Sequence, residues 1–280
     1  MKVEKAKKLG LCFGVRRAIK LLKEAVNKYG EIETLGPLAH NRLLVEALAN
    51  LGVKPINHLD QAQGKIFAIT THGVSPAVLS EIKARHIHII DTTCPIVHKA
   101  QNTAKELAET GFDVIIFGET EHSEVKGLLG WTGDKGIAAL NMKQIDGSGR
   151  SLSRLGIISQ TTQTRSAFIE FARQLMNMVG PKIEEMHLVN TLCQVTQRQQ
   201  EAAMRLARKS QLVVVIGGSN SANTKRLVEI CSPLVETHLV ETADEVDNSW
   251  LLDKHHVGIT AGASTPDEAV GELVAKLKSL

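Results

Sequence analysis

The sequence predicts an α/β protein made of three similar α/β units with mostly parallel sheets. Three observations carry this prediction. A cysteine followed by an amphipathic helical pattern occurs three times, a glycine-ended strand pattern recurs in each unit, and a second strand pattern in each unit ends in polar residues. Strands that alternate with helices favour parallel sheets, in which ligands bind beyond the carboxyl ends of the strands.

The first repeated feature is a helix that begins directly after a cysteine. Cys12 precedes GVRRAIKLLKEAVNKYG, Cys94 precedes PIVHKAQNTAKELAETG, and Cys193 precedes QVTQRQQEAAMRLARKS. Gly30 and Gly111 end the first two helices, as expected of residues with a left-handed backbone. The three cysteines suggest units at 13–94, 95–192 and 193–280.

The strands of each unit end next to polar side chains. IETLG, DVIIFG and LVVVIG predict a first strand in each unit, and four residues beyond their final glycines stand His40, His122 and Ser221. The second strands, in IFAITTH, LGIISQTT and VGITAGAS, end at His72, at Thr161 and Thr162, and at Ser264. Parallel strands would bring these residues to ligand-binding edges.

Composition narrows the functional classes. The 280 residues are 43% hydrophobic and 22% charged, no apolar run is long enough to cross a membrane, and the N-terminus lacks a signal-peptide pattern. We therefore expect a cytoplasmic protein whose four cysteines are reduced, which favours metal binding or catalysis over disulfides. The net charge of +3 and the few aromatic residues argue against a nucleic-acid partner.

Three cysteines in matching places suit an iron-sulfur cluster. If the units pack around a pseudo-threefold axis, Cys12, Cys94 and Cys193 meet near its centre, and helix N-termini there would stabilise thiolates. Three thiolates are one short of a closed structural site, so a cluster would keep one iron open for substrate. The alternative is that these three cysteines are buried and purely structural. We assign such a structural role only to the fourth cysteine, Cys231.

The polar residues at the strand ends suit an anion. Imidazole, hydroxyl and amide groups can all donate hydrogen bonds to a diphosphate, and the residues expected to do so are His40, His72, His122, Ser221, Asn223 and Ser264. Zinc binding by the three histidines is the competing interpretation. Glu124 is the best candidate acid, with Thr161 to orient it, although a solvated carboxylate at a helix start fits the sequence equally well.

Eight motifs in order resemble the hydroxymethylbutenyl diphosphate reductase family over nearly the whole chain. They are LGLCFGVRRAI, GPLAHN, THGVSP, DTTCPIVHKA, EHSEVKG, SQTT, SNSANTKRL and TAGASTPD. The resemblance implies reductive removal of the allylic hydroxyl of 4-hydroxy-3-methylbut-2-enyl diphosphate, giving isopentenyl and dimethylallyl diphosphates in the last step of the methylerythritol phosphate route. It also implies a trefoil in which residues 1–12 join the third unit.

The resemblance assigns roles to the motif residues. It implies a 4Fe-4S cluster on Cys12, Cys94 and Cys193, whose fourth iron takes the substrate hydroxyl, and proton delivery by Glu124 with Thr161. The diphosphate would bind His40, His72, His122, Ser221, Asn223 and Ser264, and Thr161 and Ala222 also belong to the expected substrate site. Two departures are visible: Ala222 stands where many relatives have serine, and Ser123 replaces a common proline.

Several alternatives stay open at the level of sequence. One alternative is the quinolinate synthase family, which has a similar pattern of three units and three cysteines around a cluster. Its substrates carry carboxylates and not a diphosphate. A redox sensor without turnover and a metal-free phosphate-binding module are the other candidates. An electron donor such as ferredoxin or flavodoxin is expected, and the chain could be a monomer or a homodimer.

Overall fold

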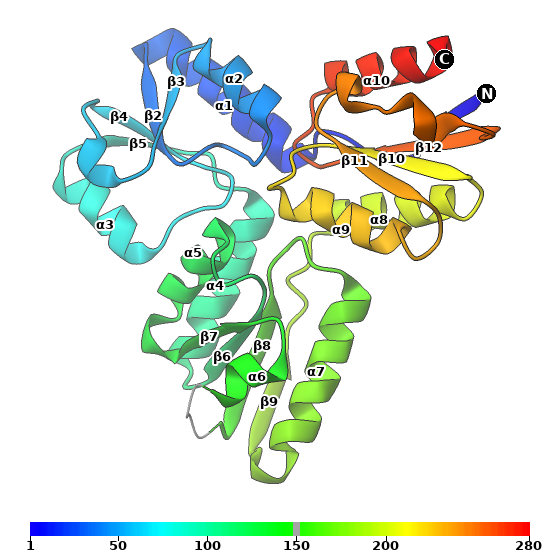
Figure 1. Ribbon diagram of the computed structural model, residues 1–280. Helices are drawn as coiled ribbons and strands as arrows, with labels where there is room; N and C mark the ends of the chain where they lie inside the picture. The colour runs from blue at the N-terminus through cyan, green and yellow to red at the C-terminus, as the bar shows by residue number, and fades with distance from the viewer. Residues whose placement is uncertain (148–151) are drawn as a thin grey trace. The chain divides into compact units, whose positions relative to one another are not determined.

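The computed structural model describes residues 1–147 and 152–280, which carry three four-stranded sheets flanked by helices (Figure 1). This confirms the predicted α/β class. The chain forms two compact units. Unit 1 holds residues 1–30, 37–55 and 194–280, and unit 2 holds residues 31–36 and 56–193. The boundaries expected at 94 and 192 and the trefoil arrangement stay predictions.

The sheet of unit 1 has the strand order β1-β12-β10-β11, and its three neighbouring strand pairs are parallel. Its strands are β1 (Lys2–Lys5), β10 (Leu212–Ile216), β11 (Thr237–Val240) and β12 (His256–Ala261). The helices of this unit are α1 (Phe13–Tyr29), α2 (Arg42–Ala49), α8 (Gln194–Ala207), α9 (Ala222–Cys231) and α10 (Asp267–Ser279). Because β1 pairs with β12, the N-terminal residues extend a sheet made of C-terminal strands.

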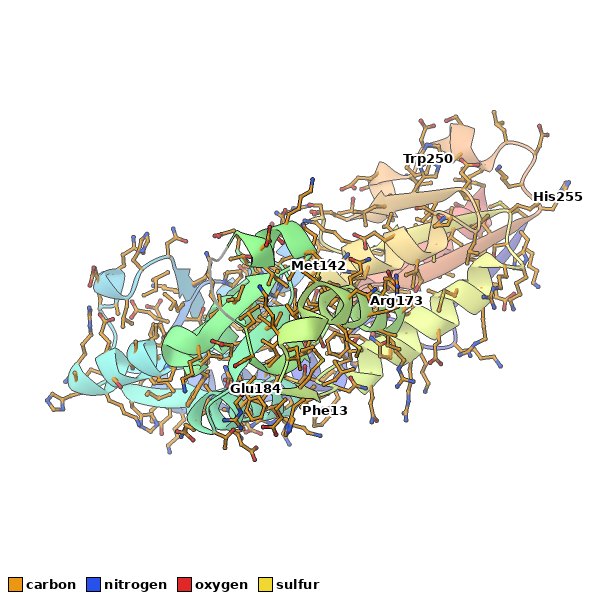
Figure 2. The ribbon with its side chains drawn as sticks, turned by 90° about the horizontal axis from the view of Figure 1, so that it is seen from below. Phe13, Met142, Arg173, Glu184, Trp250 and His255 are labelled. Atoms are coloured by element: carbon orange, nitrogen blue, oxygen red, sulfur yellow. The ribbon has the colours of Figure 1, made fainter. Side chains whose placement is uncertain are left out.

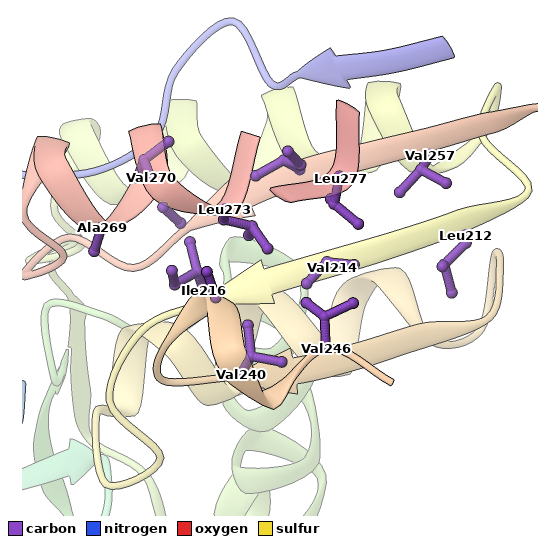
Figure 3. Close-up of a cluster of buried hydrophobic side chains, with 13 residues drawn as sticks. Leu212, Val214, Ile216, Val240, Val246, Val257, Ala269, Val270, Leu273 and Leu277 are labelled. Carbon is purple, nitrogen blue, oxygen red and sulfur yellow. The ribbon is translucent and has the colours of Figure 1, made fainter. Parts of the chain in front are cut away.

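Strand β10 is buried on both faces, which explains why LVVVI is a continuous apolar run. Leu212, Val214 and Ile216 pack with Leu273 and Leu277 of α10, as Figure 3 shows. The alternate residues Val213 and Val215 pack on the opposite face with side chains from α8 and α9. The strand end that carries the polar loop is therefore fixed by two hydrophobic layers.

Two further sheets have the strand orders β3-β2-β4-β5 and β7-β6-β8-β9. The first contains β2 (Ile32–Leu35), β3 (Val53–Ile56), β4 (Ile66–Ile69) and β5 (His88–Asp91). The second contains β6 (Asp113–Phe117), β7 (Gly136–Ala139), β8 (Arg154–Ser159) and β9 (Glu185–Leu188). The helices of unit 2 are α3 (Pro76–Ala84), α4 (Pro95–Glu109), α5 (Ser123–Trp131), α6 (Met142–Asp146) and α7 (Arg165–Val179).

Strand β6 repeats the design of β10. Ile115 and Phe117 pack with aromatic and leucine side chains of α7, whereas Val114 and Ile116 pack with residues of α4 and α5. The loops that follow β6 and β8 are therefore anchored to a rigid sheet. No helix in the described part of the chain is both long and apolar enough to cross a bilayer.

The helix ends confirm the glycine prediction. Gly30 and Gly111 have φ angles of +82° and +94°, in the region that favours glycine. The helices that follow Cys12 and Cys94 end at Tyr29 and Glu109, within two residues of these glycines.

Candidate active site

Each of the three repeated cysteines is held in the same way. Each directly precedes a helix, α1, α4 or α8, and its backbone N–H donates to a carbonyl in a loop after a parallel strand. The three pairs are Cys12 with Ala263 at 2.9 Å, Cys94 with Thr71 at 3.1 Å, and Cys193 with Thr161 at 2.8 Å. The sequence repeat is therefore also a repeat in hydrogen bonding, and it ties every cysteine to a loop that carries predicted site residues.

The thiol environments fit an anionic metal cluster. Cys12 and Cys94 are half-buried and Cys193 is buried, and helix N-termini favour the thiolate form that binds metals. Thiolates are the ligands that iron-sulfur clusters prefer. The donor set therefore fits such a cluster, although convergence of the three sulfurs stays a prediction.

Cys231 differs from these three. It lies at the end of α9, is fully buried, and packs with Val213 and Leu227 in the core of unit 1. Burial raises the pKa of its thiol to about 11, which disfavours the thiolate. This environment fits the structural role that the sequence suggested.

Glu124 and Thr161 form a buried pair in unit 2. Glu124 is in the first turn of α5 and is 2% exposed, so the solvated alternative is wrong. The Thr161 backbone N–H donates to Glu124 Oε1 at 2.6 Å, and its hydroxyl donates to Oε2 at 2.9 Å. Glu124 lies in α5 and Thr161 follows the β8 strand region, so these two elements together hold both oxygens of the carboxyl in place.

The pKa of Glu124 suits a proton donor near neutral pH. Burial raises this pKa to about 7, against the opposing effect of the two hydrogen bonds from Thr161. A carboxyl with such a pKa is populated in both protonation states at physiological pH and can deliver and regain a proton.

His122 and His72 lie next to this carboxyl loop. His122 caps α5, and its Nδ1 accepts the Glu124 N–H at 3.2 Å, so in the neutral ring the proton is on Nε2, which is a donor to an anion. The rings of His72 and His122 meet edge to face, with centroids 5.4 Å apart. The structure thus brings together four predicted residues of unit 2: Glu124, Thr161, His72 and His122.

The predicted residues of unit 1 include buried polar groups that the described protein does not satisfy. Asn223 and Ser264 are 4% and 6% exposed. Neither the amide atoms of Asn223 nor the hydroxyl of Ser264 has a hydrogen-bond partner among the described residues. Unsatisfied buried polar groups are costly, so they point to a polar ligand.

Loop packing positions the other predicted residues of unit 1. The Ser221 hydroxyl caps α9 by accepting the Thr224 N–H, and Ala222 is the buried first residue of that helix. A Cβ on Gly218 would lie 2.2 Å from the carbonyl oxygen of His40. Only glycine at 218 therefore permits the loop after β10 to approach His40 this closely.

Two buried glutamines were missed by the sequence analysis. Gln160 Oε1 accepts the Glu119 N–H at 3.1 Å, which joins the loops after β6 and β8. Gln199 of α8 donates to the Gly10 carbonyl at 2.8 Å and so fixes the loop that carries Cys12. Gln199 could have been found as a polar residue at an apolar position of the helical pattern, whereas Gln160 carries no such signal.

Comparisons with known proteins agree over nearly the full chain. A family model described as LytB protein matches residues 3–278. A 4-hydroxy-3-methylbut-2-enyl diphosphate reductase from Dehalococcoides mccartyi (strain CBDB1) is 42% identical over 280 residues, covering 100% of this chain and 99% of the relative. The enzyme of the same name from Geobacter sulfurreducens is 37% identical over 285 residues, covering 99% and 97%.

Solved structures show the same likeness. One, of (E)-4-hydroxy-3-methyl-but-2-enyl diphosphate reductase, the terminal enzyme of the non-mevalonate pathway, has a TM-score of 0.72 and 34% identity and covers both chains fully. Another, of the E-1-hydroxy-2-methyl-but-2-enyl-4-diphosphate reductase from Plasmodium falciparum, has a TM-score of 0.92 and 25% identity. It covers 99% of this chain and 88% of the other.

Proposed function

The chain belongs to the LytB protein family, and from this premise we propose that it reduces 4-hydroxy-3-methylbut-2-enyl diphosphate to isopentenyl and dimethylallyl diphosphates. The reaction breaks the allylic carbon–oxygen bond, consumes two electrons and two protons, and releases water. The observation that carries the proposal is Glu124, a buried carboxyl held by Thr161 with a pKa of about 7. Such a group can protonate the departing hydroxyl.

The cofactor of the proposed reaction is a 4Fe-4S cluster. Cys12, Cys94 and Cys193 would hold it, since each is a thiol at the start of a helix and is tied to a site loop. When bound, such a cluster supplies one-electron transfer and one iron with an open coordination position. The electrons come from an external carrier such as a ferredoxin or a flavodoxin.

The polar residues of the site bind and orient the substrate. Asn223 and Ser264 offer buried polar groups that have no hydrogen-bond partner among the described residues, and the neutral ring of His122, with His72 beside it, offers its Nε2–H group. Together with His40 and Ser221, they would bind the diphosphate, whose binding energy then positions the allylic end of the substrate. Thr161 fixes both oxygens of Glu124, so the proton donor is held in one orientation. Ala222 lacks a hydroxyl and contributes only its backbone.

The test is anaerobic purification with iron and sulfide analysis, followed by turnover of the substrate with reduced methyl viologen. We expect about four irons and four sulfides per chain, as the cluster type requires, and both diphosphate products. Replacing Cys12, Cys94 or Cys193 with serine should lower the iron content, whereas the matched Cys231→Ala variant should keep it. A protein without iron that still turns over substrate would refute the cofactor assignment.

A further inference from the structure

The segments that lead into the three repeated cysteines share one backbone anchor. In each segment, the residue two places before the cysteine donates a hydrogen bond to the carbonyl of the last residue of a strand. The three pairs are Thr92 with Ile69 of β4, Thr191 with Ser159 of β8, and Gly10 with Ala261 of β12. The repeat therefore extends to the loops that place the thiols.

Side chains strengthen this anchor before Cys94 and Cys193. In both segments, a threonine two places before the cysteine donates its hydroxyl to the strand carbonyl, and the residue three places before accepts the backbone N–H two residues ahead. These residues are Thr92 and Asp91 in one segment and Thr191 and Asn190 in the other. Before Cys12, the same places hold Gly10 and Leu9, which have no polar side-chain atom.

Gln199 supplies a side-chain anchor to this third segment from another element of unit 1. It lies in α8, is 3% exposed, and its Nε2 donates to the Gly10 carbonyl at 2.8 Å. Its Oε1 has no hydrogen-bond partner among the described residues. Because a buried unsatisfied oxygen is costly, stability alone would favour an apolar side chain of similar size at this position. The contact with Gly10 is thus the benefit that a glutamine offers here.

The backbone at Gly10 needs such a contact. Gly10 has a φ angle of +75°, in the region where glycine has the greatest freedom. Arg16 Nε also reaches this segment, by donating to the Leu11 carbonyl at 3.1 Å, and Arg16 is paired with Asp267. That contact is exposed, so water can replace it. Gln199 makes the buried contact, which water cannot easily replace.

We propose that Gln199 is a positioning residue for Cys12, which it keeps in place as a ligand of the cluster. The inference rests on the proposed function, which assigns Cys12, Cys94 and Cys193 to the cluster. Hydrogen bonds that orient metal ligands from outside commonly raise the affinity for the metal. Because Gln199 acts on the backbone two residues before Cys12, its loss should free the Cys12 thiolate ahead of the other two.

The test begins with Gln199→Met in the anaerobic holoenzyme. Methionine has a similar length and no N–H donor, so it removes the hydrogen bond to Gly10 and leaves the space filled. Iron release is followed in an excess of EDTA, with iodoacetamide present to alkylate each thiol as it is freed. Mass spectrometry of the peptides then gives the alkylated fraction of each cysteine at early times.

Two variants are matched controls. Arg16→Met removes the exposed donor to the Leu11 carbonyl in the same segment. Gln101→Met makes the same substitution at another buried glutamine, which lies in the helix after Cys94, is 2% exposed, and donates to the Val74 carbonyl at 3.5 Å. The first control tests loss of any contact in the segment, and the second tests the general effect of this substitution.

We expect Gln199→Met to release iron at least about tenfold faster than the parent protein, with Cys12 alkylated ahead of Cys94 and Cys193. Both controls should stay within about twofold of the parent rate, as expected when no buried contact to a ligand segment is lost. An unchanged rate in Gln199→Met, or early alkylation that is equal at all three cysteines, would overturn the proposal.

Gln199→Glu separates loss of the donor from a packing defect, and it also serves if Gln199→Met does not fold. The side chain keeps its shape, and burial favours the neutral carboxyl, whose O–H can donate to the Gly10 carbonyl. The rate of iron release relative to the parent protein should therefore fall toward one as the pH is lowered from about 8 to about 6. A relative rate that stays high at both pH values would show that Gln199 acts through packing, and the positioning role would be wrong.

The parent protein distinguishes this inference from the function on which it rests. If the parent holoenzyme contains no iron, the cofactor assignment is wrong, and the role of Gln199 falls with it. If the parent holds iron and Gln199→Met releases it no faster, the cofactor assignment stands and only the positioning role is wrong.

Discussion

At Glu124, burial and hydrogen bonding act on the pKa in opposite directions, and burial is the larger effect. A glutamine has nearly the same shape and can keep both contacts with Thr161 if the threonine hydroxyl turns to accept. Glu124→Gln should therefore lower kcat by at least about 100-fold through loss of the acid, with KM changed much less. The measurement is steady-state turnover with reduced methyl viologen.

The matched control for that variant is Glu121→Gln. Glu121 is an exposed carboxyl in the same loop, paired with Lys126 at 2.8 Å. Its replacement should leave kcat within about twofold, as expected for a surface substitution. Wild-type turnover by Glu124→Gln would exclude the acid role.

The raised pKa of Glu124 also makes stability depend on pH. The ordinary value of 4.5 holds in the unfolded chain and about 7 in the folded one, so the contribution is full below pH 4.5 and is lost as pH rises through 7. This loss should reach roughly 3 kcal/mol. Glu124→Gln should remove it, making the variant gain on the parent protein between pH 5 and pH 8.

Trp131 gives a direct measurement of this effect because it ends α5, the helix that begins beside Glu124. Urea unfolding is followed by Trp131 fluorescence in a Trp250→Phe background, with and without Glu124→Gln, at both pH values. The free energy of unfolding of the two proteins is compared directly at each pH. The same difference at pH 5 and pH 8 would show that Glu124 titrates normally.

At the scale of elements, the loop after β10 depends on the absence of one side chain. A Cβ on Gly218 would lie 2.2 Å from the His40 carbonyl oxygen, and a backbone atom cannot easily move away. Gly218→Ala should cost about 1–3 kcal/mol of stability and should weaken diphosphate binding. Urea unfolding monitored by Trp250 measures the first effect, and calorimetry with inorganic pyrophosphate measures the second.

Gly271→Ala is the control for this prediction. Gly271 lies in α10, and apart from its chain neighbours and the backbone of its own helix, no atom of the described residues would lie within 4 Å of a Cβ there. Alanine should stabilise this helix by up to about 1 kcal/mol because it has the higher helix propensity. If Gly218→Ala behaves like Gly271→Ala, the close approach to His40 is not a constraint.

The helices and strands also show how much of the structure could be predicted from the sequence. Strands β6 and β10 and the helices after the cysteines follow from apolar patterns that depend only on nearby residues. The hydrogen bond from Cys193 to Thr161 and the contact of Gln199 with Gly10 join distant segments, so no local pattern could specify them. The burial of Glu124 is likewise a tertiary property, which is why the sequence left its role open.

At the scale of the whole molecule, each compact unit contains one of the two tryptophans. Trp250 belongs to unit 1, where it stacks on His238 with ring centroids 3.9 Å apart, and it lies at the periphery (Figure 2). Trp131 belongs to unit 2, where its Nε1 donates to the Val74 carbonyl at 3.0 Å. Variants with a single tryptophan can therefore report on the stability of each unit separately, without assuming that the chain unfolds in one step.

Pyrophosphate should stabilise unit 1 if Asn223 and Ser264 bind the diphosphate. A ligand that binds only the folded state at 100 times its Kd adds about 2.7 kcal/mol of stability. In the Trp131→Phe protein, inorganic pyrophosphate should therefore raise the Tm reported by Trp250, whereas sodium chloride of equal ionic strength should not. Asn223→Ala should abolish this increase, because the unsatisfied amide is the group that the ligand would engage. An equal increase with chloride, or an unchanged response in Asn223→Ala, would show that pyrophosphate acts elsewhere on the molecule.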